Sequence, residues 1–125
     1  MEAILNELQE DRNASALKKK AIITEGYFKI RLSDSKFTLK LKGDITNNNV
    51  YEISKAMIKS KSSHKRFVEL DMSEVETIDM QAMSLLIINL KTLKESGMKT
   101  KVTGIGGENL KLANDLGIRF ITQIK

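Results

Sequence analysis

Hydrophobic and polar residues alternate strictly in two neighbouring stretches, 28–32 and 37–41. A period of two residues predicts strands with one buried face. The residues between them, 33–36, are Ser, Asp, Ser and Lys, which favour a turn. We therefore expect the two strands to pair as an antiparallel hairpin. Gly43 is expected to end the second strand.

After the hairpin, three stretches have apolar residues at the spacing of a helix. These predicted helices alternate with further predicted strands. Apolar residues recur at helical spacing after residue 49, again after Asp79, and a third time around residues 110–116. Strands are predicted between and after these helices, at 67–72, 99–103 and 120–124. The acid-rich residues 73–78 are predicted to form a loop. Strands joined through helices require crossover connections, which indicates a largely parallel sheet.

The predicted fold class is α/β, with a mixed, mostly parallel sheet of about five strands, an N-terminal hairpin and three helices. Residues 27–125 are expected to form this one domain. Residues 1–26 lack its regular pattern, and their short apolar stripe (Ile4, Leu5 and Leu8) predicts a helical arm or extension. Such an arm could pack on the domain, on a second copy of the chain in a homodimer, or on nothing.

Composition narrows the classes of function. Hydrophobic residues make up 41% of the chain and charged residues 30%, which suits a folded domain with a well-solvated surface. The chain has no basic start followed by an apolar run, and its longest aliphatic run, 85–88, is far shorter than the roughly 20 residues that span a bilayer. We expect a cytoplasmic protein with no direct membrane insertion.

The net charge of +5 raises the question of nucleic-acid binding. However, the cations are scattered along the predicted elements, and there are only four Phe, two Tyr and no Trp. Basic patches interleaved with stacking aromatics are missing, so no nucleic-acid partner is predicted.

Candidate catalytic groups are scarce. The chain has no Cys, and its single His, His64, lies in a stretch of Ser and Lys, so no metal site or triad can be assembled around it. The glycines of 104–107 do not match the spacing of a phosphate-binding loop. We therefore predict that the chain is not an enzyme and needs no cofactor.

The start of the long helix is the most informative place in the sequence. In a parallel sheet, strand ends and the following helix starts meet at the edge where ligands and partners bind. Asp79 is expected to cap the helix, whereas Met80 could be either exposed there or folded into the core. Five acids within residues 69–79 could provide a negative rim for docking, or could reflect the ordinary preference of loops and helix starts for acids. Leu85 and Ile88 lie opposite the main apolar stripe of this helix. They are expected to pack within the molecule, on the neighbouring helix or the N-terminal arm, and the alternative is that they are exposed for a partner.

The order of the elements and several short strings resemble the STAS domain, a family named for sulfate transporters and anti-sigma factor antagonists. The resemblance covers residues 27–125, and the strings that carry it are 41–46, 67–73, 75–79, 94–99 and 116–118. It implies a module that binds protein partners through the start of the long helix. The partner-binding residues implied by it are Asp79, Met80, Gln81, Ala82, Ser84, Thr46 and Asn47.

In family members that antagonise anti-sigma factors, the residue after the Asp is a Ser or Thr that a partner kinase phosphorylates to release the complex. Here that position is Met80, which cannot be phosphorylated, and Ala82 replaces the family's Gly. The resemblance therefore implies docking onto an anti-sigma factor or serine-kinase-like regulator, in signal transduction and transcriptional regulation, without the phosphorylation that drives partner switching. The alternative that it implies is an accessory subunit of an ABC-type membrane transport complex, bound to the transporter ATPase.

Overall fold

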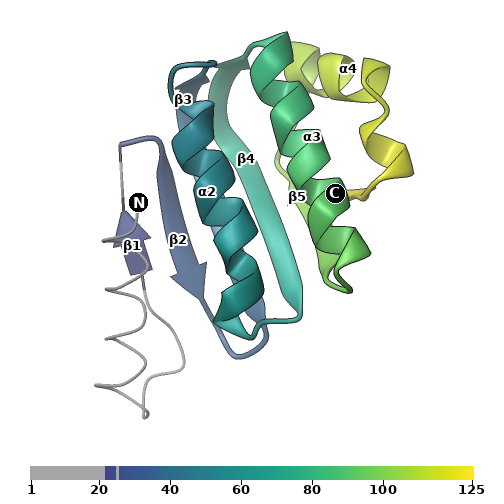
Figure 1. The fold of residues 1–125 in the computed structure, drawn as a ribbon. Helices are drawn as coiled ribbons and strands as arrows, with labels where there is room; N and C mark the ends of the chain where they lie inside the picture. Colours follow the sequence, from purple (N-terminus) through teal and green to yellow (C-terminus); the bar gives the residue numbers. More distant parts are fainter. Residues whose placement is uncertain (1–21, 25) are drawn as a thin grey trace.

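A six-stranded sheet forms the centre of the fold, and its strands lie side by side in the order in which they occur in the chain (Figure 1). The structure is a computed structural model and describes residues 22–24 and 26–125. The strands are β1 (Ile22–Thr24), β2 (Phe28–Leu32), β3 (Lys36–Ile45), β4 (Phe67–Ile78), β5 (Lys99–Thr103) and β6 (Gln123–Ile124). The helices are α2 (Val50–Lys59), α3 (Met80–Glu95) and α4 (Gly107–Asp115), with 3-10 turns at Ser60–Ser63 and Ile118–Phe120.

Strand pairing confirms the predicted fold class. β2 and β3 form the antiparallel hairpin, with Ile30 opposite Leu39. β3, β4, β5 and β6 then run parallel to one another, because each connection passes through a helical segment. The sheet is therefore mixed and mostly parallel.

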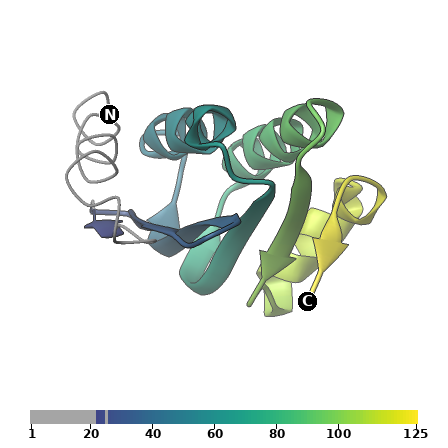
Figure 2. The ribbon, with the colours of Figure 1, turned by 90° about the horizontal axis from the view of Figure 1, so that it is seen from below.

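The core lies between the sheet and the two helices α2 and α3, which pack side by side on one face (Figure 2). Alternate residues of the strands point into it, and Phe28, Phe37 and Leu70 are buried almost completely. A hydrogen bond joins the two helices, since Nδ2 of the buried Asn89 in α3 donates to Ser54 Oγ in α2 at 2.6 Å. The opposite face of the sheet, here called the outer face, carries the other alternate residues: Lys29, Arg31, Lys36, Thr38, Lys40, Phe67, Glu69, Asp71, Lys99, Lys101 and Thr103.

Two predictions about the ends of the sheet were wrong. Residues 22–24 fall inside the predicted helical arm but form β1, which pairs antiparallel with β2. Their sequence, Ile-Ile-Thr, is β-branched throughout and suits a strand on the open edge of β2. The rest of the predicted arm lies outside the described residues. At the other end, Phe120 belongs to a 3-10 turn, so the last strand begins only at Gln123.

Two strands are longer than the pattern predicted. β3 continues past Gly43 to Ile45 through two register shifts, and Gly43 takes a positive φ of 78° in this irregular stretch. The residues predicted as an acid-rich loop, 73–78, instead continue β4 alongside this extension of β3. This end of β4 extends beyond the last residue that pairs with β5, so its side chains are mostly exposed and polar and do not show the pattern of a buried strand.

Candidate docking site at the start of α3

The carboxyl ends of β3 and β4 meet at one edge of the sheet. Ile45 pairs with Ile78, and the backbone N–H of Asp79 donates to the carbonyl of Ile45 at 3.1 Å. This contact places the loop 46–49, which leads into α2, beside the first turn of α3 (Figure 1). The sheet thus unites the two segments that the sequence predicted to border one surface.

Asp79 joins these two segments through its two carboxylate oxygens. Oδ1 accepts from the backbone N–H of Ala82 at 2.7 Å, which confirms the predicted N-cap of α3. Oδ2 accepts from the backbone N–H of Asn47 at 3.2 Å. Both oxygens are therefore held by backbone donors, and the carboxylate is fixed in place.

The loop 46–49 is ordered by its own asparagines. Asn49 Oδ1 accepts from the backbone N–H of Thr46 at 2.9 Å, and Asn49 Nδ2 donates to the carbonyl of Asp44 at 2.8 Å. Thr46 Oγ1 accepts from the backbone N–H of Asn48 at 3.1 Å. Asn47 Nδ2 reaches Gln81 Oε1 at 3.4 Å. The loop therefore has a defined shape and touches α3 at two points.

The predicted site residues differ in what they present to a partner. Met80 is 60% exposed, and Asp79, Gln81 and Asn47 are also exposed, so these four form the accessible part. Ala82 is completely buried, so its side chain cannot contact a partner. Ser84 and Thr46 are half-buried, and the Ser84 hydroxyl donates to the Met80 carbonyl at 2.8 Å.

Leu85 and Ile88, the two apolar residues opposite the main stripe of α3, have different environments. Leu85 is half-buried and packs against the core, as expected. Ile88 is 58% exposed, so the expectation that it packs within the molecule was wrong. It lies two turns beyond Met80 on the same helix.

The sequence did not single out three residues that shape this edge. Asn49 organises the loop with its side chain and does not cap α2 through it. Asp44 and Thr77 link β3 and β4 below the loop, since Thr77 Oγ1 donates to Asp44 Oδ1 at 2.7 Å. The run of three asparagines at 47–49 was a signal for a self-bonded turn, because Asn side chains readily bond nearby backbone groups.

The five acids predicted as a possible negative rim do not act together. Glu69 forms an ion pair with Lys36, and Glu74 forms one with Lys40 at 2.7 Å. The hydrogen bond and the charge of Lys40 lower the pKa of the Glu74 carboxyl below its ordinary value. Only Glu76 and Asp79 remain exposed without a lysine partner among the described residues. The edge at α3 is therefore only weakly acidic.

Two structural tests bear on other functions. In the part of the chain that the structure describes, no three His, Cys, Asp or Glu residues lie together in a way that could hold a metal ion. No helix within those same residues combines the length and hydropathy that crossing a membrane requires.

Comparison with known proteins identifies the family. The family model described as the STAS domain matches residues 27–125. The chain belongs to the STAS domain family. A comparison with curated protein sequences finds none that matches.

Several solved structures share the fold. A putative anti-sigma factor antagonist from Thermotoga maritima superposes with a TM-score of 0.67 at 19% identity, over 78% of this chain and 84% of the other. The unphosphorylated anti-sigma factor antagonist SpoIIAA gives a TM-score of 0.59 at 9% identity, over 85% of this chain and 86% of the other. SLC26A9 gives 0.55 at 11% identity, over 91% of this chain but only 22% of its own. These identities show a common fold, and the fold alone.

Proposed function

We propose that this STAS protein is a non-catalytic, cytoplasmic docking module of the anti-sigma factor antagonist type. Its partner is an anti-sigma factor or serine-kinase-like regulator, and the contact is made by the start of α3 with the loop 46–49. The residues proposed to touch the partner are Asp79, Met80, Gln81 and Asn47, while Ala82, Ser84 and Thr46 support them from beneath.

The observation that carries this proposal is the exposure of Met80. Met80 has 60% of its surface in water, so its side chain contributes little apolar burial to the stability of the monomer. It stands directly after the fixed Asp79 and beside an ordered loop, so its position is well defined. Flexible, polarizable methionine side chains are well suited to protein-binding surfaces.

The nearest hydroxyl groups support docking without a phosphorylation switch. The Thr77 hydroxyl donates to Asp44, and the Ser84 hydroxyl donates to the carbonyl one turn earlier in α3. Neither follows Asp79 directly, and the Met80 side chain has no hydroxyl that a kinase could phosphorylate. The proposed contact is therefore constitutive, and any control acts on the partner or on the amount of this protein.

A second candidate is an accessory subunit of an ABC-type membrane transport complex that binds the transporter ATPase. It is the alternative that the family resemblance implies, and a fold similar to that of this chain also occurs within the much longer SLC26A9 chain. Constitutive docking through Met80 suits this role equally well. The two candidates differ in the partner and not in the surface used.

The test is affinity capture of the tagged full chain from its native cell, with and without detergent, read by mass spectrometry. The wild type is compared with Met80→Asp, which places a charge at the proposed contact, and with Ile88→Asp as the matched control. Both substitutions replace an exposed apolar residue of α3 by the same acid.

The regulator hypothesis predicts recovery of a soluble kinase-like protein that Met80→Asp loses and Ile88→Asp keeps. Recovery of a transporter with its ATPase, in detergent and with the same dependence on Met80, would contradict the regulator hypothesis and support the accessory-subunit candidate. A partner retained by a folded Met80→Asp variant would show that docking uses another surface.

A further inference from the structure

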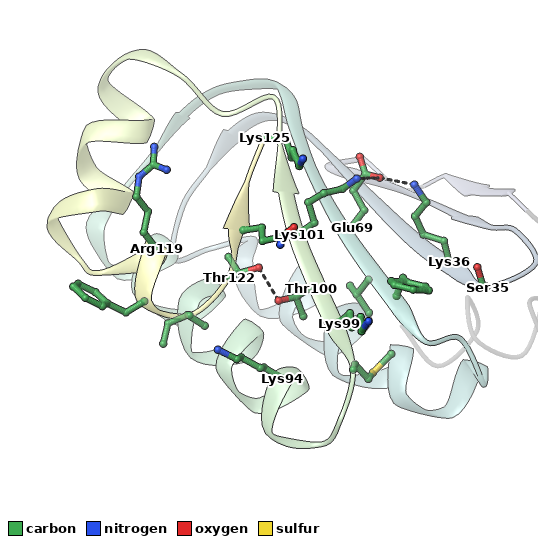
Figure 3. A pocket seen from close by; sticks show the side chains of 16 residues that line it. Ser35, Lys36, Glu69, Lys94, Lys99, Thr100, Lys101, Arg119, Thr122 and Lys125 are labelled. Carbon is green, nitrogen blue, oxygen red and sulfur yellow. Dashed lines mark hydrogen bonds and ion pairs between the residues drawn. The ribbon is translucent and has the colours of Figure 1, made fainter.

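A concave region lies at the opposite end of the molecule from Met80. It is a pocket of about 730 Å³ that runs from the end of α3, past the amino ends of β4 and β5, to the outer face of the sheet (Figure 3). Ser35 and Lys36 line it from the start of β3, and Lys125 lines it from beyond β6. Because β3, β4 and β5 run parallel, their amino ends lie at the edge opposite Asp79. The pocket is therefore separate from the proposed docking site.

Positive charge is concentrated in this pocket. Among the described residues, six Lys and Arg residues line it, against one acid. The acid is Glu69, and the cations are Lys36, Lys94, Lys99, Lys101, Lys125 and Arg119. No local pattern in the sequence marks this cluster, because its members are spread from Lys36 to Lys125 along the chain.

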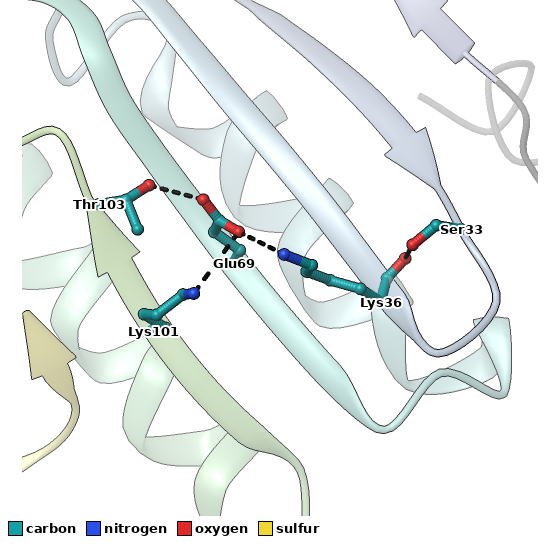
Figure 4. A network of polar contacts seen from close by, with 5 residues as sticks. All are labelled: Ser33, Lys36, Glu69, Lys101 and Thr103. Atoms are coloured by element: carbon teal, nitrogen blue, oxygen red, sulfur yellow. Dashed lines mark hydrogen bonds and ion pairs between the residues drawn. The ribbon is translucent and has the colours of Figure 1, made fainter. Parts of the chain in front are cut away.

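Glu69, the acid among the described lining residues, already has polar partners. Glu69 Oε1 lies 2.9 Å from Lys36 Nζ and 4.0 Å from Lys101 Nζ, and Oε2 accepts from Thr103 Oγ1 at 2.7 Å (Figure 4). Among the described residues, no carboxylate pairs with Lys94, Lys99 or Lys125. Their ammonium charges are therefore not neutralised by a described carboxylate, although Lys99 also lies over the Phe67 ring.

The remaining lining offers apolar and hydroxyl groups. Phe67 is 39% exposed with Lys99 Nζ 5.7 Å from its ring centre, and Phe120 is 88% exposed. Met98 and Ile121 line the same pocket. The hydroxyls of Thr100 and Thr122 lie 2.6 Å apart within it. The pocket thus offers contacts to an organic group as well as to anions.

We propose that this pocket binds a small organic molecule that carries more than one phosphate group. Its volume falls within the range of about 300–1,000 Å³ that small ligands use. Clustered phosphates concentrate enough negative charge to neutralise several lysines at once, and lysine binds phosphate as a point charge. Phe67, Met98 and Ile121 would contact the organic part.

The test measures binding of inorganic tripolyphosphate, as the minimal phosphate cluster, to the full chain by isothermal titration calorimetry. Citrate serves as the carboxylate comparison. The pocket variant Lys94→Gln with Lys99→Gln removes two exposed cations without a carboxylate partner. The control, Lys55→Gln with Lys111→Gln, removes two exposed cations from α2 and α4, outside the pocket.

We expect saturable binding of one tripolyphosphate, weakened at least about tenfold in the pocket variant and less than about threefold in the control. Glu69→Gln should tighten binding, because it removes the only acid that lines the pocket among the described residues. Met80→Asp should bind as the wild type does, which separates this proposal from the docking proposal. If the double pocket variant fails to fold, Lys125→Gln replaces it.

Three results would overturn the proposal. Equal losses in the pocket variant and the control would show general charge attraction. Citrate binding as tight as tripolyphosphate binding would remove the preference for phosphate. Lysine-dependent binding to phosphatidylcholine vesicles that contain phosphatidic acid, without binding of tripolyphosphate, would assign the cations to a membrane surface.

Discussion

The backbone N–H of Asn47 donates to the carboxylate of Asp79, 32 positions later in the chain. The same carboxylate accepts from Ala82 in the first turn of α3. One side chain therefore caps a helix and fixes a loop that belongs to a different strand–helix connection. This arrangement holds the surroundings of Met80 in one shape, which reduces the entropy lost when a partner binds.

Asp79→Ala removes both hydrogen bonds and should lower the free energy of unfolding by about 1–2 kcal/mol, since a lost N-cap alone costs about 1 kcal/mol. Chemical denaturation measures this change. Asp79→Asn is the matched control, because its side-chain oxygen can still cap Ala82, and it should cost clearly less. Equal stability of the wild type and Asp79→Ala would contradict the role of this carboxylate.

The sequence predicted this fold well where one face of each element is buried. The alternation around Phe28 and Phe37 and the helical spacing after Asp79 were direct readings of core positions, and Asp79 itself was recognisable as a cap. Residues 73–78 were not recognisable as a strand because most of them lie outside the core. Their sequence therefore shows neither the two-residue period of a half-buried strand nor the period of a helix. The contact between Asn47 and Gln81 depends on the pairing of β3 with β4, which no local pattern encodes.

Gly104 should resist substitution because two strands approach closely there. It follows β5 with a φ of 73°, and a Cβ at this position would lie 2.6 Å from Ser73 Cβ and 2.7 Å from its backbone. Gly104→Ala should therefore cost roughly 2–4 kcal/mol, from the positive φ and the overlap together. Gly106→Ala is the control, since its Cβ meets nothing within 4 Å and its backbone is extended. Similar melting temperatures for the two variants would show that the ends of β4 and β5 separate easily.

The contact between Asn89 and Ser54 is the polar link between α2 and α3. Ser54→Ala leaves the buried Asn89 amide without its acceptor and should lower the free energy of unfolding by roughly 1–3 kcal/mol. Adding Asn89→Leu to Ser54→Ala should restore part of this loss, because no buried amide is then left unpaired. The double variant is measured by denaturation beside each single variant. Stability lower in the double variant than in Ser54→Ala would contradict this account.

Glu69 should make stability depend on pH in the acidic range. Burial by itself would raise the pKa of its carboxyl, but the hydrogen bonds from Lys36 and Thr103 and the charges of Lys36 and Lys101 outweigh burial and lower the pKa below its ordinary value of 4.5. A carboxyl with a lowered pKa in the folded state stabilises the fold above its unfolded pKa, and this stabilisation disappears as the pH falls through the folded pKa.

Glu69→Gln cannot titrate, so the wild type should exceed it in stability by a constant amount above about pH 5. This amount is about 1 kcal/mol, because Lys36 and Lys101 are partly exposed and water screens their charges. Below pH 4.5 the difference should shrink steadily, as followed by urea denaturation at several pH values. Glu74→Gln is the control, since its carboxylate and Lys40 are both at the surface, and it should change stability little at any pH. A difference between the wild type and Glu69→Gln that stays constant down to pH 3, about one and a half units below the ordinary pKa of 4.5, would mean that the Glu69 carboxyl does not stabilise the fold through its charge.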